Sequence, residues 1–232
     1  MPLTELVLAS WNIRKCIGLD RRRDPSRVVK VLNEIDADIV ALQEADRRLG
    51  SRPAALPDYL VRRETDYVPI DAGGHESSLG WHGNAILLKS KHNCIERHSL
   101  SLPGLEPRGA LVAEVKTNGL RIRVAGVHLG FLRMYRQRQM RAIREHLGAL
   151  PAMPSIVMGD FNEWSGSKGF EALGDFSVHS PGATFHSRRP VGHLDRFAVS
   201  CGMSVDRLQV VKTPLSLVSS DHLPIRARVR LG

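Results

Sequence analysis

Short apolar runs recur along almost the whole chain, and this pattern limits the possible folds more than any other sequence feature. The runs are rich in Val, Ile and Leu and are separated by Gly, Pro and polar residues, as is typical of β-strands. They are LVLASWNI from Leu6, DIVALQ from Asp38, NAILL from Asn84, ALVAEV from Ala110, IRVAGVHL from Ile122, SIVMGDF from Ser155 and LDRFAVS from Leu194. Several end on a polar residue, which is where layered folds present site residues.

Helices are predicted in three places between these strands. The first begins after Asp24, a good N-cap, with Pro25 at the first helical position, and ends near Asp36. The second covers about 134–150, where apolar residues recur every three or four positions and arginines mostly avoid that stripe. A short third helix is expected within about 167–173. The irregular stretch 50–80, which carries Arg52, is expected to be a long surface loop, and such loops are often functional.

Length and composition are those of an ordinary globular protein. The chain has 232 residues, of which 42% are hydrophobic and 25% charged, so we expect one domain over residues 1–232, and a monomer. No apolar run reaches the roughly 20 residues needed to cross a bilayer, and no signal peptide is recognisable, so a cytoplasmic location is expected. The three cysteines show no CxxC spacing and are interpreted as free thiols.

The chain is strongly basic, with a formal net charge of +9 and a pI of about 10.0. Its field attracts anions, which suits a nucleic-acid backbone or an anionic membrane surface, and the sign of the charge does not choose between them. Excess basic charge that serves only solubility is the alternative explanation.

Oxygen donors follow several of the predicted strands. Asn12 ends the first strand, Glu44 follows the second in LQE, Asp160 and Asn162 lie in GDFN, and Asp221 lies in SSDH. Mg²⁺ and Mn²⁺ prefer carboxylate, amide and water oxygens over thiolate or histidine cages. The predicted cofactor is therefore Mg²⁺ or Mn²⁺.

Two histidines supply the remaining chemistry. His128 lies in GVHLG and His222 directly follows Asp221, while Asp195 offers a carboxylate that could hold a ring nitrogen. A histidine oriented by a carboxylate can accept a proton from water near neutral pH, and a divalent ion can screen a phosphate. Together these groups indicate metal-dependent hydrolysis of a phosphate ester.

The ordered series WN, LQE, VHL, GDFN, LD and SDH, spread from Trp11 to His222, resembles the endonuclease/exonuclease/phosphatase superfamily. The resemblance implies an α/β (α+β) fold of the DNase I type, a four-layer sandwich in which helices flank two central, mostly antiparallel β-sheets. It implies Glu44, Asn12 and Asp221 at the metal. It also implies Asp160 and Asn162 as positioning groups for water and phosphate, and His222 paired with Asp195 as the general base.

His128 matches a histidine that some members use to contact the scissile phosphate. Arg14, Asn84 and Asn162 are expected to contact phosphate with it. Arg14 stands where members that cut abasic DNA carry an aspartate, and an arginine can hold a phosphate but not a second metal ion. Arg196 replaces a common aromatic residue beside Asp195.

The substrate is expected to be a phosphodiester, and nucleic acid is favoured over anionic lipid. Basic clusters flank the motifs, at Arg14 and Lys15, at residues 21–23 and at Arg188 and Arg189, although such clusters can be solvated loop charge. Trp81, His82 and Trp164 could line a substrate groove. The alternative is a phospholipid or phosphoinositide head group, for which no clear apolar, aromatic-tipped insertion loop is found. A minor alternative is a phosphate-binding module without catalysis.

Overall fold

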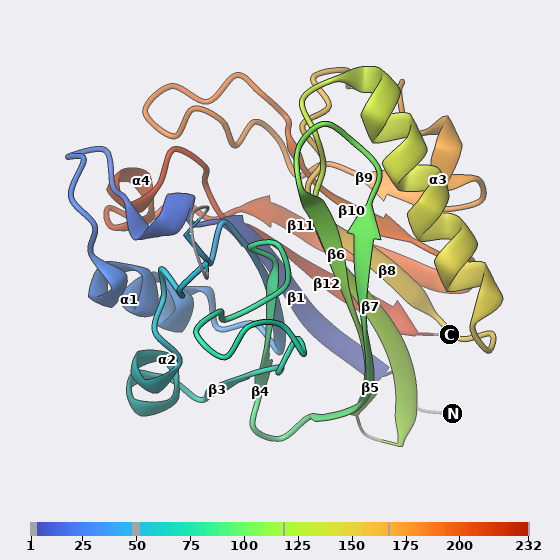
Figure 1. Cartoon of the computed structure of the whole chain (residues 1–232), viewed down its shortest axis with the longest axis horizontal. Helices are drawn as coiled ribbons and strands as arrows, with labels where there is room; N and C mark the ends of the chain where they lie inside the picture. Colours follow the sequence, from blue (N-terminus) through green and yellow to red (C-terminus); the bar gives the residue numbers. More distant parts are fainter. Residues whose placement is uncertain (1–3, 48–51, 118, 167, 232) are drawn as a thin grey trace.

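Two six-stranded β-sheets form the centre of the molecule in a computed structural model that describes residues 4–47, 52–117, 119–166 and 168–231 (Figure 1). The first sheet has the strand order β11 (Met203–Val210), β12 (Ile225–Leu231), β1 (Thr4–Asn12), β2 (Ile39–Gln43), β4 (Ala85–Lys89) and β3 (Tyr67–Pro69). The second has the order β5 (Asn93–Leu102), β6 (Arg108–Thr117), β7 (Leu120–His128), β8 (Ser155–Asp160), β10 (Asp195–Val199) and β9 (Ser177–His179). Among the strands of the described residues, the pairs β1–β2 and β7–β8 are parallel and the other pairs are antiparallel.

The two sheets pack face to face through one hydrophobic core. Leu8 and Ile86 of the first sheet lie in the same buried cluster as Val124 and Phe197 of the second. The outer face of β1 is buried too, since Trp11 packs in a separate cluster beneath the helices. Strands buried on both faces have few polar positions, which explains why this one appears as a continuous apolar run in the sequence.

Helices cover both outer faces and complete the expected four-layer sandwich. α1 (Pro25–Ile35) and α2 (Asp58–Glu64) share a core cluster with the first sheet, and α3 (Arg133–Ala149) shares one with the second. The short elements are the 3-10 turns η1 (Arg14–Cys16) and η2 (Glu171–Leu173) and the helix α4 (Ser216–Ser219). Within the described residues, no helix is both long and apolar enough to cross a lipid bilayer.

The first helix has the predicted boundaries. Asp24 caps α1 by accepting a hydrogen bond from the Arg27 backbone N–H at 3.2 Å, and Asp36 ends it in a left-handed conformation. Val28, Leu32 and Ile35 are buried as expected. Local capping chemistry and the apolar stripe agree here, so the sequence alone is sufficient to predict where α1 begins and ends.

Other predictions need correction. The helix expected within 167–173 is only the three-residue turn η2, because Gly169 has a φ of 94° and breaks the helical path. The stretch 50–80 is not all loop, since its described part contains α2 and β3. In α3, Arg136 does not lie on the exposed face: it is buried and donates to Oε2 of Glu163 at 2.8 Å.

Candidate active site

Strand pairing places His128, Asp160 and Asp195 in one row at the edge of the second sheet. His128 ends β7 and is the Cα partner of Asp160, which ends the parallel strand β8. Asp195 begins β10 and is the antiparallel partner of the same Asp160. Because paired residues lie opposite one another, three polar residues far apart in the sequence meet through strand register.

The first sheet contributes Asn12, the last residue of β1. Its Nδ2 donates to Oδ2 of Asp160 at 3.0 Å, and its Oδ1 accepts from the backbone N–H of Arg14 at 3.1 Å. The contact with Asp160 crosses from one sheet to the other. The site is therefore built at the junction of the two sheets.

Asp160 is fixed by the turn that follows it. The backbone N–H of Asn162 donates to its Oδ1 at 2.9 Å, and Nδ2 of Asn162 donates to the Leu129 carbonyl at 2.8 Å. Burial raises the pKa of Asp160 above its usual range. The charge of His222 lowers this pKa, whereas the charge of Asp195 raises it further. Asp160 is thus a rigid, buried acceptor next to the histidines.

His222 and Asp195 form the shortest contact between the proton-handling groups. Nδ1 of His222 lies 2.9 Å from Oδ2 of Asp195, and the same oxygen accepts from Oγ1 of Thr184 at 2.5 Å. The other ring nitrogen, Nε2, lies 3.6 Å from Oδ2 of Asp160. The backbone is held as well, because Nε1 of Trp11 donates to the His222 carbonyl at 2.9 Å.

The surrounding carboxylates control the charge of His222. Burial lowers the pKa of His222, but the charges of Asp195 and Asp160 and the hydrogen bond to Asp195 outweigh it and raise the pKa to about 10. The ring is therefore an imidazolium at neutral pH when only these carboxylates surround it. His128 joins the group through its Nε2, which lies 3.4 Å from Oδ2 of Asp160.

The two carboxylates expected to hold a metal ion each face a basic side chain. Oε2 of Glu44 is paired with Nζ of Lys15. Oδ2 of Asp221 lies 3.2 Å from Nε of Arg14. Glu44, Asp221 and the Asn12 amide supply only oxygen donors, a set that suits a hard divalent cation.

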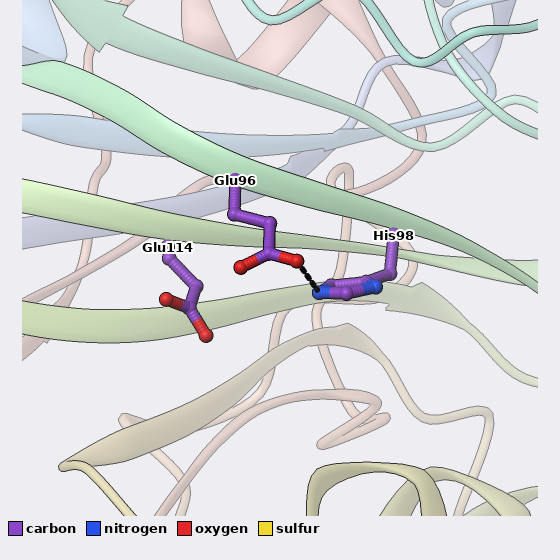
Figure 2. A group of neighbouring side chains, drawn as sticks. All are labelled: Glu96, His98 and Glu114. Atoms are coloured by element: carbon purple, nitrogen blue, oxygen red, sulfur yellow. Dashed lines mark ion pairs between the residues drawn. The ribbon is translucent and has the colours of Figure 1, made fainter. Parts of the chain in front are cut away.

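Two groups of side chains in the described residues have ligand atoms within 4.8 Å of one another, as a metal ion requires. One is Asp160, Asp195 and His222, which lies in the site just described. The other is Glu96, His98 and Glu114 on β5 and β6 (Figure 2). The first group differs from the expected ligand set, because its members were expected to handle protons and phosphate.

The group in Figure 2 shares no residue with the candidate active site. Nε2 of His98 lies 3.5 Å from Oε1 of Glu96, and its ring packs edge-on against His146 of α3 with centroids 5.3 Å apart. Glu114 already accepts two hydrogen bonds from the buried Arg123, and this guanidinium opposes a further cation. Arg123 lies near the end of β7 remote from His128.

Asn84 is not placed to bind phosphate. Its side chain is buried, and its Nδ2 donates to the carbonyls of Trp81 at 3.2 Å and Gly109 at 2.9 Å. Both amide hydrogens are therefore used within the protein, and the remaining Oδ1 can only accept. Asn84 joins the loop before β4 to the start of β6, so its role is structural.

Several residues around the site adopt left-handed backbone conformations that non-glycine residues rarely occupy. Arg14, Lys15 and Glu44 have φ values of 45°, 56° and 55°, and His82 and Asn162 have values of 49° and 50°. Such conformations carry strain that the surrounding structure must support, and they concentrate at functional sites.

A small basic pocket adjoins the cluster. It encloses about 110 Å³ and shares Glu44, Lys15 and His128 with the site. Its other walls include the basic residues Arg47, Arg52 and Arg108, with His82, Asp46 and Glu106. An engineered cavity of about 150 Å³ holds benzene, so this pocket has room for one compact group such as a phosphate.

Hydrogen bonds within the pocket leave basic groups available to a ligand. Nη1 of Arg52 lies 2.6 Å from Nδ1 of His82, and the pKa of His82 is lowered by burial and by the Arg52 charge. His82 is therefore neutral and accepts from Arg52. Arg108 is buried and donates to Glu106 at 2.6 Å, while its buried Nε has no hydrogen-bond partner among the described residues.

A wider groove lies on the Arg14 side of the site. It encloses about 650 Å³ and is lined by Arg14, Arg21, Arg188 and His186. Two of the basic clusters seen in the sequence, residues 21–23 and Arg188–Arg189, thus contribute to one groove.

Sequence reasoning singled out neither Arg108 nor Asp46, because no motif marks them and only the tertiary structure brings them to the site.

The arrangement of these motifs agrees with a known protein family. Residues 9–222 match the model of the Endonuclease/Exonuclease/phosphatase family. The chain belongs to this family. Family membership makes it a phosphoester hydrolase by class, as the resemblance implied.

Individual members of the family are similar over most of the chain. The YbhP protein of Escherichia coli strain K12 is 31% identical over 216 residues, which cover 85% of each chain. A mannosyl-6-phosphatase of Bacteroides thetaiotaomicron VPI-5482 has the same fold, with a TM-score of 0.74, 18% identity and coverage of 97% and 99% of the two chains. TDP2 of D. rerio, complexed with a single-strand DNA product, gives a TM-score of 0.72 with the same identity and coverage.

Proposed function

We propose that the protein hydrolyses a phosphodiester with the help of a divalent metal ion, using His222 as the general base. The observation that carries this proposal is the 2.9 Å contact between Nδ1 of His222 and Oδ2 of Asp195. A buried carboxylate on one ring nitrogen fixes the orientation of the ring and leaves Nε2 for proton transfer. Nε2 is directed towards Asp160, where the expected phosphate-positioning groups converge.

Glu44, Asn12 and Asp221 would hold the metal ion, which we propose to be Mg²⁺ or Mn²⁺. Their oxygen donors fit such an ion, and Lys15 and Arg14 would have to release or share the two carboxylates. When bound, the ion would screen the phosphate charge, stabilise the leaving oxygen and lower the pKa of His222 towards neutrality.

The remaining residues are assigned by their positions. Asp160 orients the water and the His222 ring, because it accepts from Asn12 and lies near both histidines. Asn162, His128 and Arg14 contact the phosphate, and Nε2 of His222 takes the proton from the attacking water. These groups form a complete set, which argues against the alternative of a phosphate-binding module without catalysis.

Nucleic acid is the first candidate substrate. The groove lined by Arg14, Arg21 and Arg188 suits a second phosphate of a polyanion. Trp164 is exposed and packs edge-on against Phe185, whose ring lies 4.9 Å from that of His222, so a base could stack beside the site. The DNA-bound TDP2 structure adds a precedent for this fold.

A lipid head group is the second candidate, and a specific observation favours it. Large apolar side chains are exposed on the loops around the site, including Leu105, Phe131 and Leu132. The leucine side chains neither stack on bases nor bind phosphates. Exposed apolar side chains on these loops would suit insertion into a lipid surface.

The reaction is tested with bis-p-nitrophenyl phosphate in the presence of Mg²⁺ or Mn²⁺, with EDTA as the negative control. We expect turnover that EDTA abolishes and that His222→Ala and Glu44→Ala abolish too. Activity that survives in either variant would contradict the site assignment, and no turnover by the wild type on any substrate would favour the binding module. Plasmid DNA, single-strand DNA, RNA and anionic phospholipids, each with the His222→Ala control, then separate the two substrate candidates.

A further inference from the structure

Six large apolar side chains at the edge that carries the candidate active site are more than half exposed. We call them the apolar rim: Leu105, Phe131, Leu132, Met134, Trp164 and Val191. Leu105 is the most exposed of them, at 79%. Large exposed apolar side chains gathered at one edge of a protein are typical of interaction sites.

Four of the rim residues lie on loops that follow or precede site residues, Leu105 lies on the β5–β6 loop, and Met134 lies in the first turn of α3. Phe131 and its neighbours follow His128 at the end of β7, and Trp164 follows Asp160 at the end of β8. Val191 precedes Asp195, the first residue of β10. Figure 1 shows the β5–β6 loop, which carries Leu105, beside the beginning of α3.

Hydrogen bonds and packing hold these loops in place. Gln139 of α3 donates to the Pro103 carbonyl at 2.9 Å and accepts from the Gly130 N–H at 2.8 Å, which joins the Leu105 loop to the Phe131 loop. On the other side, a Cβ on Gly192 would lie 3.1 Å from the Trp164 ring. The apolar side chains are thus displayed by fixed loops, so their exposure is a built-in property of this edge.

The charge around the rim identifies the partner. Arg133, Arg138 and Arg141 are exposed on α3, and Arg188 and Arg189 are exposed on the loop that carries Val191. Apolar side chains that share a helix and a loop with exposed arginines match the surface of a bilayer that contains anionic lipids, since the apolar groups enter the head-group region and the arginines attract the charge. Nucleic acid would satisfy the arginines but would leave Leu105, Leu132 and Val191 exposed to water.

We propose that the apolar rim docks the protein on the surface of an anionic lipid bilayer, with the candidate active site facing the lipid head groups. Docking itself does not require catalysis, but the consequence that the substrate is a lipid phosphodiester rests on the function proposed above. The basic pocket beside Glu44 then receives a compact phosphorylated part of the head group.

Docking is tested by sedimentation with vesicles of phosphatidylcholine, with and without phosphatidylglycerol. We expect the wild type to bind only the vesicles with phosphatidylglycerol, and the variant Leu105→Ser with Leu132→Ser to bind at least about tenfold more weakly. Tyr59→Ser, which removes an exposed ring on α2, is the matched control and should bind like the wild type. Equal binding by both variants, or no binding by the wild type, overturns the proposal.

A second measurement does not depend on these variants. Brominated lipids quench tryptophans that enter the bilayer. Of the other two tryptophans, Trp11 is fully buried and Trp81 is half-buried, with its Nε1 donating to the Leu100 carbonyl, so most of the quenching in the wild type should disappear in Trp164→Phe. Unchanged fluorescence of the vesicle-bound wild type contradicts docking through the rim.

If the double serine variant instead loses affinity for oligo-dT, the rim binds nucleic acid and the proposal fails. Hydrolysis of bis-p-nitrophenyl phosphate without vesicles tests catalysis separately, because lost turnover with retained vesicle binding contradicts only the proposed function.

Discussion

Nδ1 of His222 lies 2.9 Å from Oδ2 of Asp195, a residue that has almost no solvent exposure and also accepts a hydrogen bond from Thr184. The carboxylate orients the ring and stabilises its protonated form. We therefore expect Asp195→Asn to lower kcat by about 10²–10⁴-fold with little change in KM, measured with a soluble diester. Thr184→Val, which removes only the support of Asp195, should have a smaller effect. An Asp195→Asn enzyme within threefold of the wild type would falsify the assigned pairing.

The raised pKa of His222 predicts how stability depends on pH in the metal-free protein. Its folded pKa of about 10 lies above its ordinary value of 6.5, so the folded state binds the proton more tightly than the unfolded state. The stabilisation is complete below pH 6.5 and is lost as the pH rises through about 10. Urea unfolding in EDTA should show a fall in stability across this window for the wild type and a smaller fall for His222→Gln. If the stability of the two proteins falls by the same amount as the pH rises, His222 is not the origin of this pH dependence.

Metal affinity should respond in opposite directions to two neighbouring substitutions. Glu44→Gln removes a carboxylate ligand and should weaken Mg²⁺ or Mn²⁺ binding by at least about tenfold, measured by calorimetry. Lys15→Gln removes the ammonium group paired with Glu44 and should tighten binding, because this ammonium group then no longer competes with the metal ion for the carboxylate. Weaker binding in Lys15→Gln would show that Lys15 supports the metal site instead of opposing it.

The basic pocket should contribute to binding of a phosphate group. Arg52→Gln removes a guanidinium held by the neutral His82, and hydrogen bonds to charged groups are worth about 1.5–3 kcal/mol. We expect the inhibition constant of inorganic phosphate to rise by about tenfold or more. Arg62→Gln, on exposed α2, is the matched control and should leave the constant unchanged. An equal rise in both variants would indicate a general charge effect.

The buried pair of Arg136 and Glu163 should matter for stability. Nη2 of Arg136 lies 2.8 Å from Oε2 of Glu163, and both side chains are less than one-tenth exposed. Removing one partner leaves a buried charge, so Arg136→Met should cost about 3–5 kcal/mol of unfolding free energy in urea. Adding Glu163→Gln to that variant should recover part of the loss. If the double variant is less stable than Arg136→Met, the pair does not act through charge.

Local rules explain why much of the fold could be predicted. The cap at Asp24, the proline after it and the apolar stripe of Val28, Leu32 and Ile35 define α1 within a short segment. Most central strands are recognisable because burial on both faces removes polar residues from them. Five strands were missed. β3 and β9 have only three residues each, β5 and β11 expose many side chains, and β12 alternates buried residues with half-exposed arginines, which interrupts its apolar run.

The sequence by itself determined the reaction class of this protein: the ordered motifs from Asn12 to His222 indicate a phosphoesterase, and the match to the family agrees with that class. Only the tertiary structure decided which partners these residues have. Strand register set Asp160 beside His128 and Asp195, the packing of the sheets brought Asn12 to Asp160, and Asn84 became a structural residue. The apolar rim also became visible only there, because exposure depends on long-range packing, whereas apolar residues of core and surface look alike in a sequence.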